Sequence, residues 1–264
     1  MSIVLLIIDP QVDFCCPGRG SLVVPGAEQD MDRLARMVRR HASEIDAIHV
    51  TLDSHHRVDI AHPIFWIDAE GNHPPAFTLV SMPDVVEGRW RATAPEMRAR
   101  ALEYVRALEQ GGRHTLCVWP YHCLIGSEGH AVEPGLFEAL RAWEEQFRVV
   151  DFVSKGTNPY TEHYSAIRAE VADPGDPGTQ VNQRLIDTLL AADRVLIGGE
   201  AGSHCVAQTV QDLAEHFGDR ADRLTLLTDA VSPVPGFEPL QETFLAEMAQ
   251  RGLGFRNTVT AFDP

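Results

Sequence analysis

The segment RVLIGGEAGSHCVAQT, from Arg194 to Thr209, joins the two patterns that decide the fold. RVLIGG is a short, β-branched run of the kind that forms a buried strand. From Val206 onward, apolar residues recur at helical spacing as far as Phe217. Cys205 therefore lies where a strand turns into a helix, behind a run of small residues. The free N–H groups at the start of a helix favour negative charge, which a thiolate could use.

The same alternation of strand and helix runs through the whole chain. The expected strands are Ile3 to Asp9, Ala47 to Asp53, Thr115 to Trp119, Arg148 to Lys155, Arg194 to Gly199 and Leu224 to Thr228. The expected helices are Ala27 to Arg40, Pro95 to Gln110, Leu136 to Phe147, Gln180 to Ala192, Cys205 to Phe217 and Phe237 to Arg251. This order predicts an α/β fold: three layers, doubly wound, with a mostly parallel six-stranded sheet and helices on both faces.

The length of 264 residues fits one domain over residues 1–264. The segment from Pro63 to Val118 is long for a single crossover connection, and it carries a helix and many Pro and Gly residues. We expect an insertion or lid at about residues 63–118.

The composition of the chain indicates its cell compartment and excludes some classes of binding partner. A net charge of −16 argues against nucleic acid and anionic membranes, which both need a basic face. Five scattered cysteines without disulfide spacing favour a reducing, cytoplasmic compartment. MSIVLLIID at the start has no basic region, so it is expected to be a strand and not a signal peptide, and no later segment is long enough to span a membrane. A small-molecule partner is therefore expected.

Reactive side chains follow several of the expected strands. In an open parallel sheet, ligands bind beyond the carboxyl ends of the strands. Asp9, Asp53 and Lys155 end three strands, and Cys205 begins a helix after another. A nearby base and cation could activate the thiol as a nucleophile. A lone free cysteine is usually just a small buried hydrophobe, but the joint arrival of these groups favours a catalytic site.

Three segments carry a resemblance to a known family. IIDPQVDFC at Ile7 to Cys15, SKG at Ser154 to Gly156 and GGEAGSHCV at Gly198 to Val206 resemble the signature segments of the isochorismatase-like cysteine hydrolases. The resemblance implies a catalytic triad of Asp9, Lys155 and Cys205, and an oxyanion hole of the Ala201 and Cys205 N–H groups. It further implies hydrolysis through a cysteine thioester, a cis peptide bond between Glu200 and Ala201, and a homo-oligomer, dimer or tetramer.

A second constellation points to a metal. TLDSHHRVDIAH places Asp53 and His55 two residues apart, and WPYHC adds His122. A carboxylate with imidazoles suits Zn²⁺, Fe²⁺ or Mn²⁺. The combination is similar to the metal site of the nicotinamidase (pyrazinamidase) branch, which implies one divalent ion held by Asp53, His55 and His122 with His62 as a fourth residue. His56 is the alternative to His55 as a metal ligand. In that branch the metal holds the ring nitrogen of nicotinamide.

Aromatic residues flank the proposed site. Phe14, Trp119 and Tyr164 match positions that enclose the pyridine ring in nicotinamidases. Phe14 and Trp119 could instead be ordinary core residues, but each flanks a proposed site residue, which favours the pocket role. The remaining histidines near these motifs are expected to be surface or structural residues: His130, His163 and His204. The other cysteines are also expected to be structural: Cys15, Cys16, Cys117 and Cys123.

Two positions depart from the nicotinamidase pattern. Glu200 replaces a usually apolar residue, and Ser203 replaces an aspartate.

The reaction that the resemblance implies is the hydrolysis of nicotinamide to nicotinate and ammonia. Three alternatives stay open: an amidase acting on another carboxamide or carbamoyl compound, a hydrolase in which the metal activates water and Cys205 is passive, and a non-catalytic binding protein.

Overall fold

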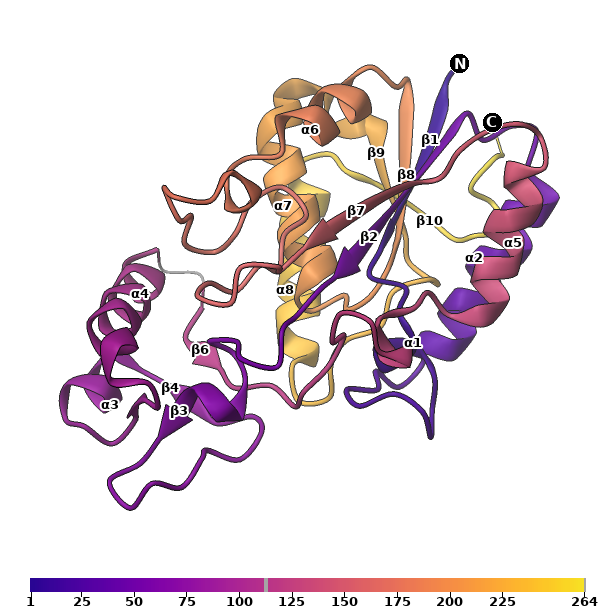
Figure 1. Cartoon of the computed structure of the whole chain (residues 1–264). Coiled ribbons are helices and arrows are strands. Elements are labelled where there is room, and N and C mark those ends of the chain that lie inside the picture. Colours follow the sequence, from indigo (N-terminus) through magenta and orange to yellow (C-terminus); the bar gives the residue numbers. More distant parts are fainter. Residues whose placement is uncertain (112–113, 264) are drawn as a thin grey trace.

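The computed structural model describes residues 1–111 and 114–263 and is built around one six-stranded sheet (Figure 1). Its strand order is β10-β9-β8-β1-β2-β7, and every neighbouring pair is parallel. The strands are β1 (Ile3–Ile8), β2 (Ala47–Asp53), β7 (Asp151–Lys155), β8 (Arg194–Gly199), β9 (Leu224–Leu227) and β10 (Gly254–Arg256). The predicted doubly wound α/β fold is confirmed, and the main sheet is wholly parallel.

The strand order explains why helices cover both faces. The chain begins at β1, moves outward to β2 and β7, then crosses back to β8 and continues to β9 and β10. Because parallel crossovers are right-handed, reversing direction moves the connecting helices to the opposite face. Figure 1 shows α2 and α5 on one side and α6, α7 and α8 on the other. These helices are α2 (Ala27–Arg40), α5 (Pro134–Glu144), α6 (Gln183–Leu190), α7 (Cys205–Phe217) and α8 (Glu238–Gln250).

The reversal lies between β1 and β8, at the centre of the sheet. Both faces of β1 are covered, so its residues from Leu5 to Ile8 are fully buried. A continuous apolar run is what such a doubly covered parallel strand requires. In open α/β sheets, ligands bind at this switch point, beyond the carboxyl ends of the strands. Four residues, Val12–Cys15, form the short helix α1 just beyond β1.

One predicted strand of the main sheet is wrong. Thr115 to Trp119 contains only the two-residue strand β6 (Leu116–Cys117), which pairs with β4 (Leu79–Val80) outside the main sheet. The sixth strand of the sheet is β10, which was not predicted. The 115–119 run is apolar because it packs against the hydrophobic core as a connection, and an apolar run alone does not identify its partner.

Residues 63–111 and 114–118 form a group of small elements beside the main sheet, at the lower left of Figure 1. They comprise β3 (Trp66–Ile67), β4, α3 (Met82–Val86), β5 (Arg91–Ala92), α4 (Arg98–Gln110) and β6. β3 pairs with β5 in an antiparallel ribbon. Whether this segment acts as a lid stays a prediction. Within residues 1–111 and 114–263, no helix has the length and apolar content needed to cross a membrane.

Candidate active site

The proposed catalytic residues meet at the carboxyl edge of the sheet, around the switch point. Asp9 directly follows β1, Lys155 ends β7, and Cys205 begins α7 after β8. Asp53 ends β2 and pairs in register with Lys155. The side chain of Gln11 clamps the Asp53 backbone, accepting from its N–H at 2.7 Å and donating to its carbonyl at 2.8 Å.

The ammonium group of Lys155 contacts the side chains of Asp9, Asp53 and Cys205. Its Nζ lies 2.8 Å from Oδ2 of Asp9, 3.0 Å from Oδ1 of Asp53 and 3.5 Å from Sγ of Cys205. It also donates to the carbonyl of His163 at 3.0 Å. The lysine is 2% exposed, so its charge is compensated almost entirely by these partners. Burial opposes the charged form, yet Asp53 and Asp9 raise the pKa of Lys155 well above its usual value.

Burial favours the protonated thiol of Cys205, and a carboxyl group lies beside it. Burial raises the pKa of Cys205 well above that of a free thiol; Lys155 opposes this shift and Asp9 adds to it. The thiol–Asp9 hydrogen bond contributes in the same direction. Burial also raises the pKa of Asp9, while Lys155 opposes the rise. Thr51 donates its hydroxyl to Oδ1 of Asp9 at 2.6 Å and accepts the Asp9 N–H at 2.9 Å, which fixes the carboxylate.

Two backbone donors lie free at the turn before α7. Among the residues that the structure describes, neither the Ala201 N–H nor the Cys205 N–H donates a hydrogen bond. Both residues are buried. The Glu200–Ala201 peptide bond is cis, as predicted. Free N–H groups beside a thiol are what an oxyanion hole requires.

The departure at Glu200 is accommodated by a buried carboxyl pair. Glu200 is 0% exposed, its Oε2 accepts the Ser232 N–H at 3.2 Å, and its carboxyl hydrogen-bonds that of Asp30. Ser232 also donates its hydroxyl to Oδ2 of Asp30 at 2.5 Å and accepts the Gly202 N–H at 2.7 Å. Burial, and next the charge of Asp30, raise the pKa of Glu200 well above its usual value. The other departure, Ser203, has a structural role: its hydroxyl oxygen accepts a hydrogen bond from the Val234 N–H at 3.0 Å.

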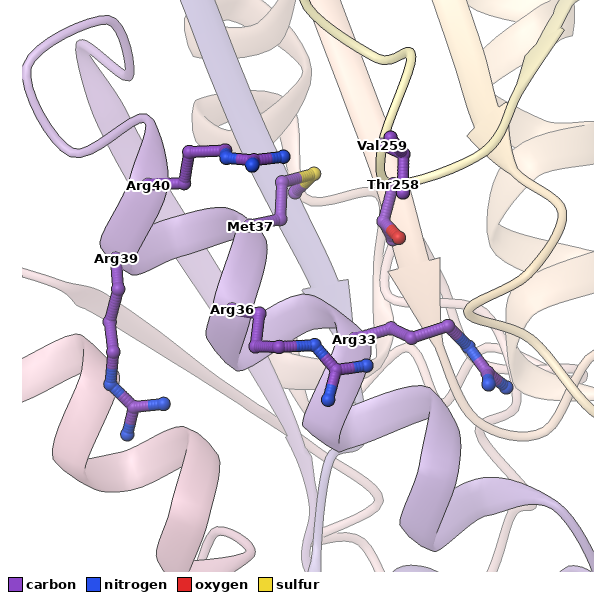
Figure 2. A pocket seen from close by; sticks show the side chains of 7 residues that line it. All are labelled: Arg33, Arg36, Met37, Arg39, Arg40, Thr258 and Val259. Atoms are coloured by element: carbon purple, nitrogen blue, oxygen red, sulfur yellow. The ribbon is translucent and has the colours of Figure 1, made fainter.

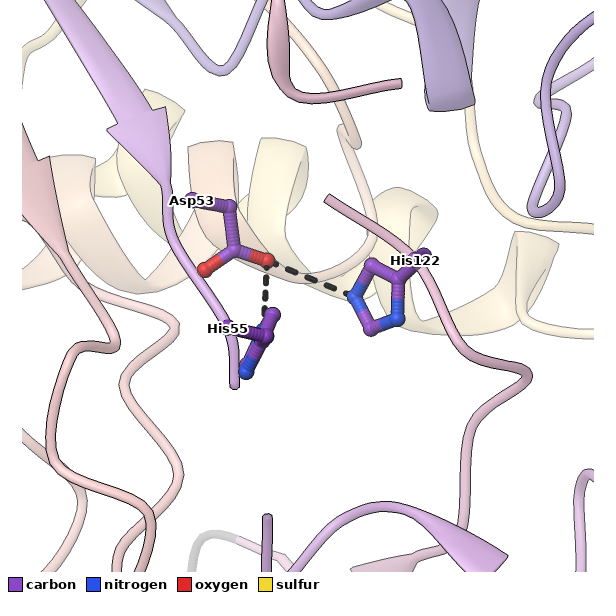
Figure 3. A group of neighbouring side chains, drawn as sticks. All are labelled: Asp53, His55 and His122. Atoms are coloured by element: carbon purple, nitrogen blue, oxygen red, sulfur yellow. Dashed lines mark hydrogen bonds and ion pairs between the residues drawn. The ribbon is translucent and has the colours of Figure 1, made fainter. Parts of the chain in front are cut away.

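Asp53, His55 and His122 form a compact group (Figure 3). Oδ2 of Asp53 lies 3.0 Å from Nε2 of His55 and 3.4 Å from Nε2 of His122. One ligand atom from each residue falls within 4.8 Å of the others, a separation that a single ion can bridge. His56, the alternative to His55, is exposed.

The hydrogen bonds behind these histidines fit a metal. Nδ1 of His55 pairs with Asp59 at 3.0 Å, Nδ1 of His122 with the Pro120 carbonyl at 2.8 Å, and Nδ1 of His62 with the His56 carbonyl at 3.1 Å. Each partner oxygen accepts a hydrogen bond from Nδ1–H and leaves Nε2 as the ligand atom, as is usual for histidines that bind a metal.

His62 supports the same conclusion. It is fully buried, and its Nε2 has no hydrogen-bond partner among the described residues. Burial and the neighbouring histidines His55 and His122 lower its pKa to about 4, which leaves a neutral imidazole. Its ring centroid lies 5.2 Å from that of His55 and 5.5 Å from that of His122. An orphaned lone pair beside a carboxylate and two imidazoles suits a borderline divalent cation such as Zn²⁺.

The three predicted aromatic residues line the cavity next to Cys205 and Asp53. Phe14 lies with its ring centroid 5.5 Å from that of His122. Trp119 donates its indole N–H to the Tyr164 hydroxyl at 3.0 Å. The cavity measures only about 30 Å³, so a ring-sized ligand must displace some of its lining.

The sequence reasoning missed several residues at the site. His204, expected to be a surface or structural residue, is buried and lines the cavity, and its ring lies 5.2 Å from that of Trp119. Glu162 also lines it, with Oε2 unpartnered among the described residues and a pKa that burial raises to about 8. Thr51 and Asp59 complete the set. The adjacency of His204 to Cys205 was the one available signal.

The remaining residues expected to be structural behave as such. His163 accepts the Gly156 N–H, and His130 pairs with the Ser54 hydroxyl at 2.8 Å. All five cysteines are free, and four of them are buried.

Comparison with known proteins adds a fold relationship. No protein-family model and no curated protein matches the chain. Among solved structures, it is similar to the yeast nicotinamidase Pnc1p, with 18% identity over 96% of this chain and 98% of that chain and a TM-score of 0.65. The L. infantum PnC1 in complex with nicotinate has 21% identity, 98% and 93% coverage and a TM-score of 0.59. A pyrazinamidase of Pyrococcus horikoshii in complex with zinc has 21% identity, 97% and 99% coverage and a TM-score of 0.57. The chain therefore has the fold of the nicotinamidases and pyrazinamidases.

Proposed function

We propose that this protein is a cysteine amidohydrolase that converts nicotinamide to nicotinate and ammonia through a thioester on Cys205. The observation that carries the proposal is the buried contact of Lys155 with Asp9, Asp53 and Cys205 at the switch point of the sheet. The nicotinamidase fold and the nicotinate bound to the L. infantum structure support this substrate class.

Because burial favours the protonated thiol, Cys205 needs a base to become a nucleophile. Asp9 takes the proton from Sγ of Cys205 as the sulfur attacks the carboxamide carbon, and the ammonium of Lys155 stabilises the charges of both groups. The N–H groups of Ala201 and Cys205 hold the oxyanion of the tetrahedral intermediate. Asp9 returns the proton to the departing nitrogen, which leaves as ammonia. A water then gives a proton to Asp9 and attacks the thioester carbon, and the restored thiol takes that proton back.

A divalent cation would be held by Asp53, His55 and His122, with Nε2 of His62 close by. When bound, such an ion supplies a Lewis acid that fixes a heteroaromatic nitrogen and so orients the carboxamide. The role of the protein is to hold the three imidazoles by their Nδ1 atoms, so that each Nε2 faces the same place. Aromatic side chains at Phe14, Trp119 and Tyr164 would enclose the ring.

The test is ammonia release from nicotinamide by the metal-loaded protein. Cys205→Ala should abolish it while metal content stays that of the parent, because the thiol is the nucleophile and not a ligand. The matched control is Cys16→Ala, a half-buried cysteine outside the cavity, which should keep full activity. Ammonia release by Cys205→Ala at the parental rate would refute the mechanism.

A substrate panel separates the proposal from a different carboxamide as substrate. Glu162 lines the cavity and has one carboxyl oxygen without a partner among the described residues, which could favour a carboxamide bearing an additional hydrogen-bonding group. Nicotinamide, pyrazinamide and aliphatic amides should be compared by kcat/KM, with and without a chelator. The proposal includes a cytoplasmic setting, consistent with five free cysteines, and a homo-oligomer, which light scattering would test.

A further inference from the structure

An arginine-rich groove lies away from the candidate active site, between the second half of α2 and the segment after β10 (Figure 2). Its volume is about 610 Å³, within the range of small-molecule sites. It is lined by Arg33, Arg36, Met37, Arg39, Arg40, Thr258 and Val259. Four arginines in eight residues are unusual in a chain with 22 basic residues and a net charge of −16.

The helix period places three of these arginines in one row. At 3.6 residues per turn, Arg33, Arg36 and Arg40 lie within about 60° of each other, and Arg33 and Arg40 are separated by about 10 Å along the axis. Figure 2 shows the guanidinium groups of Arg33 and Arg36 directed toward the Thr258 side and that of Arg40 toward Met37. Arg39 points away and donates to the Gly135 carbonyl at 3.0 Å.

The three arginines of this row differ in how many partners their guanidinium groups have within the protein. Arg33 is held by Oδ1 of Asp30 at 2.6 Å and by the Asp229 carbonyl. Among the described residues, Arg36 pairs with the exposed Asp32 alone, a surface contact that contributes little to stability. Within residues 1–111 and 114–263, Arg40 has no ion pair or hydrogen bond. Two guanidinium groups, about one turn apart, are therefore available to a ligand.

The helix dipole accounts for only part of this pattern. A cation in the last turn of a helix is stabilised by the carbonyl end, which explains Arg39 and Arg40. It does not explain Arg36, which lies above the last turn and faces the same groove. Guanidinium groups match phosphate oxygens in bidentate pairs, and two of them about 6 Å apart along the helix axis, at Arg36 and Arg40, suit two linked phosphates.

We propose that this groove is a binding site for a diphosphate-bearing small molecule, with Arg36 and Arg40 as its anion ligands. The phosphate could come free, as pyrophosphate, or on a nucleotide, in which case Thr258 and Val259 would contact the nucleoside part. Arg33 is joined through Asp30 to Ser232 and Glu200, so the groove is also connected by hydrogen bonds to the turn before Cys205.

The test is calorimetric titration of the full chain with pyrophosphate and with ADP, each at two salt concentrations. Saturable binding that weakens with salt is expected, and Arg36→Glu with Arg40→Glu should weaken it by about tenfold or more. The matched control, Arg106→Glu with Arg251→Glu, changes the charge equally at exposed arginines elsewhere and should leave binding unchanged. Arg36→Lys with Arg40→Lys should give an intermediate affinity, because bidentate pairing is lost.

Each result decides the proposal. Tighter binding of ADP than of pyrophosphate identifies a nucleotide as the ligand, and equal binding identifies the phosphates alone. No binding of either compound overturns the proposal. So does equal weakening by the groove and control variants, because that result shows a general charge effect. Circular dichroism of each variant confirms that it is folded, and binding does not depend on the proposed amide hydrolysis.

Discussion

Replacing Glu200 by Gln should make the protein more stable, by an amount that grows with pH. Glu200 is completely buried against Asp30, and its pKa is raised well above the usual value. Above its ordinary pKa of 4.5, the unfolded chain releases a proton that the folded chain keeps. The free energy of unfolding then falls by about 1.4 kcal/mol per pH unit, until the pH reaches the pKa of the folded state.

Glutamine imitates the protonated carboxyl without this titration. Its oxygen can still accept the Ser232 N–H, and its amide can donate to Asp30 as a protonated Glu200 would. The stability of Glu200→Gln relative to the parent should therefore rise by about 1.4 kcal/mol per pH unit across the window that begins near pH 4.5. Titrating groups that do not contact Glu200 contribute equally to both proteins and cancel in the difference.

Urea unfolding of both proteins from about pH 5 to about pH 8 measures this difference directly. Glu242→Gln, at an exposed position on α8, serves as the matched control and should show no pH-dependent difference. A constant difference between Glu200→Gln and the parent over this range would refute the reasoning, because it would mean that Glu200 is ionised in the folded protein.

Three further changes test the rest of the site. Tyr164→Phe removes the acceptor of the Trp119 indole N–H and should destabilise the protein by about 1 kcal/mol in thermal unfolding, whereas an unchanged protein would show that water replaces the hydroxyl. Asp59→Ala removes the acceptor that holds the His55 ring and should weaken zinc affinity by about tenfold to a hundredfold in a chelator competition; parental affinity would show that Asp59 does not orient His55 toward a metal. His62→Ala should also lower zinc affinity, while the exposed His56→Ala should not; the reverse order would contradict the assignment.

The sheet could largely be predicted from the sequence, because buried parallel strands leave continuous apolar runs. β1 and β8 are such runs, and the ends of α2 and α7 were predicted to the residue. β10 could not be predicted in the same way, because it is three residues long and only half-buried at an edge of the sheet. Residues 115–119 show the converse error, since their burial comes from packing outside the sheet.

The residues of the candidate site that end or directly follow a strand could be predicted from the sequence. Asp9, Asp53 and Lys155 follow from the rule that carboxyl ends of parallel strands share one edge. Glu162 lies in a loop whose course no periodic pattern describes, so its burial in the cavity could not be predicted. Asp59 was missed for the same reason: its role depends on a ring orientation that exists only in the folded chain.

The position of Lys155 has a consequence for folding cooperativity. Its strand, β7, is at the edge of the sheet and has a neighbour on one side only, and such strands normally fray. Asp9 after β1 and Asp53 at the end of β2 place two buried carboxyl groups close together, and the ammonium that β7 supplies contacts both of them. The edge strand is thus pinned at its carboxyl end, and amide hydrogen exchange along β7 should slow progressively from Asp151 toward Lys155.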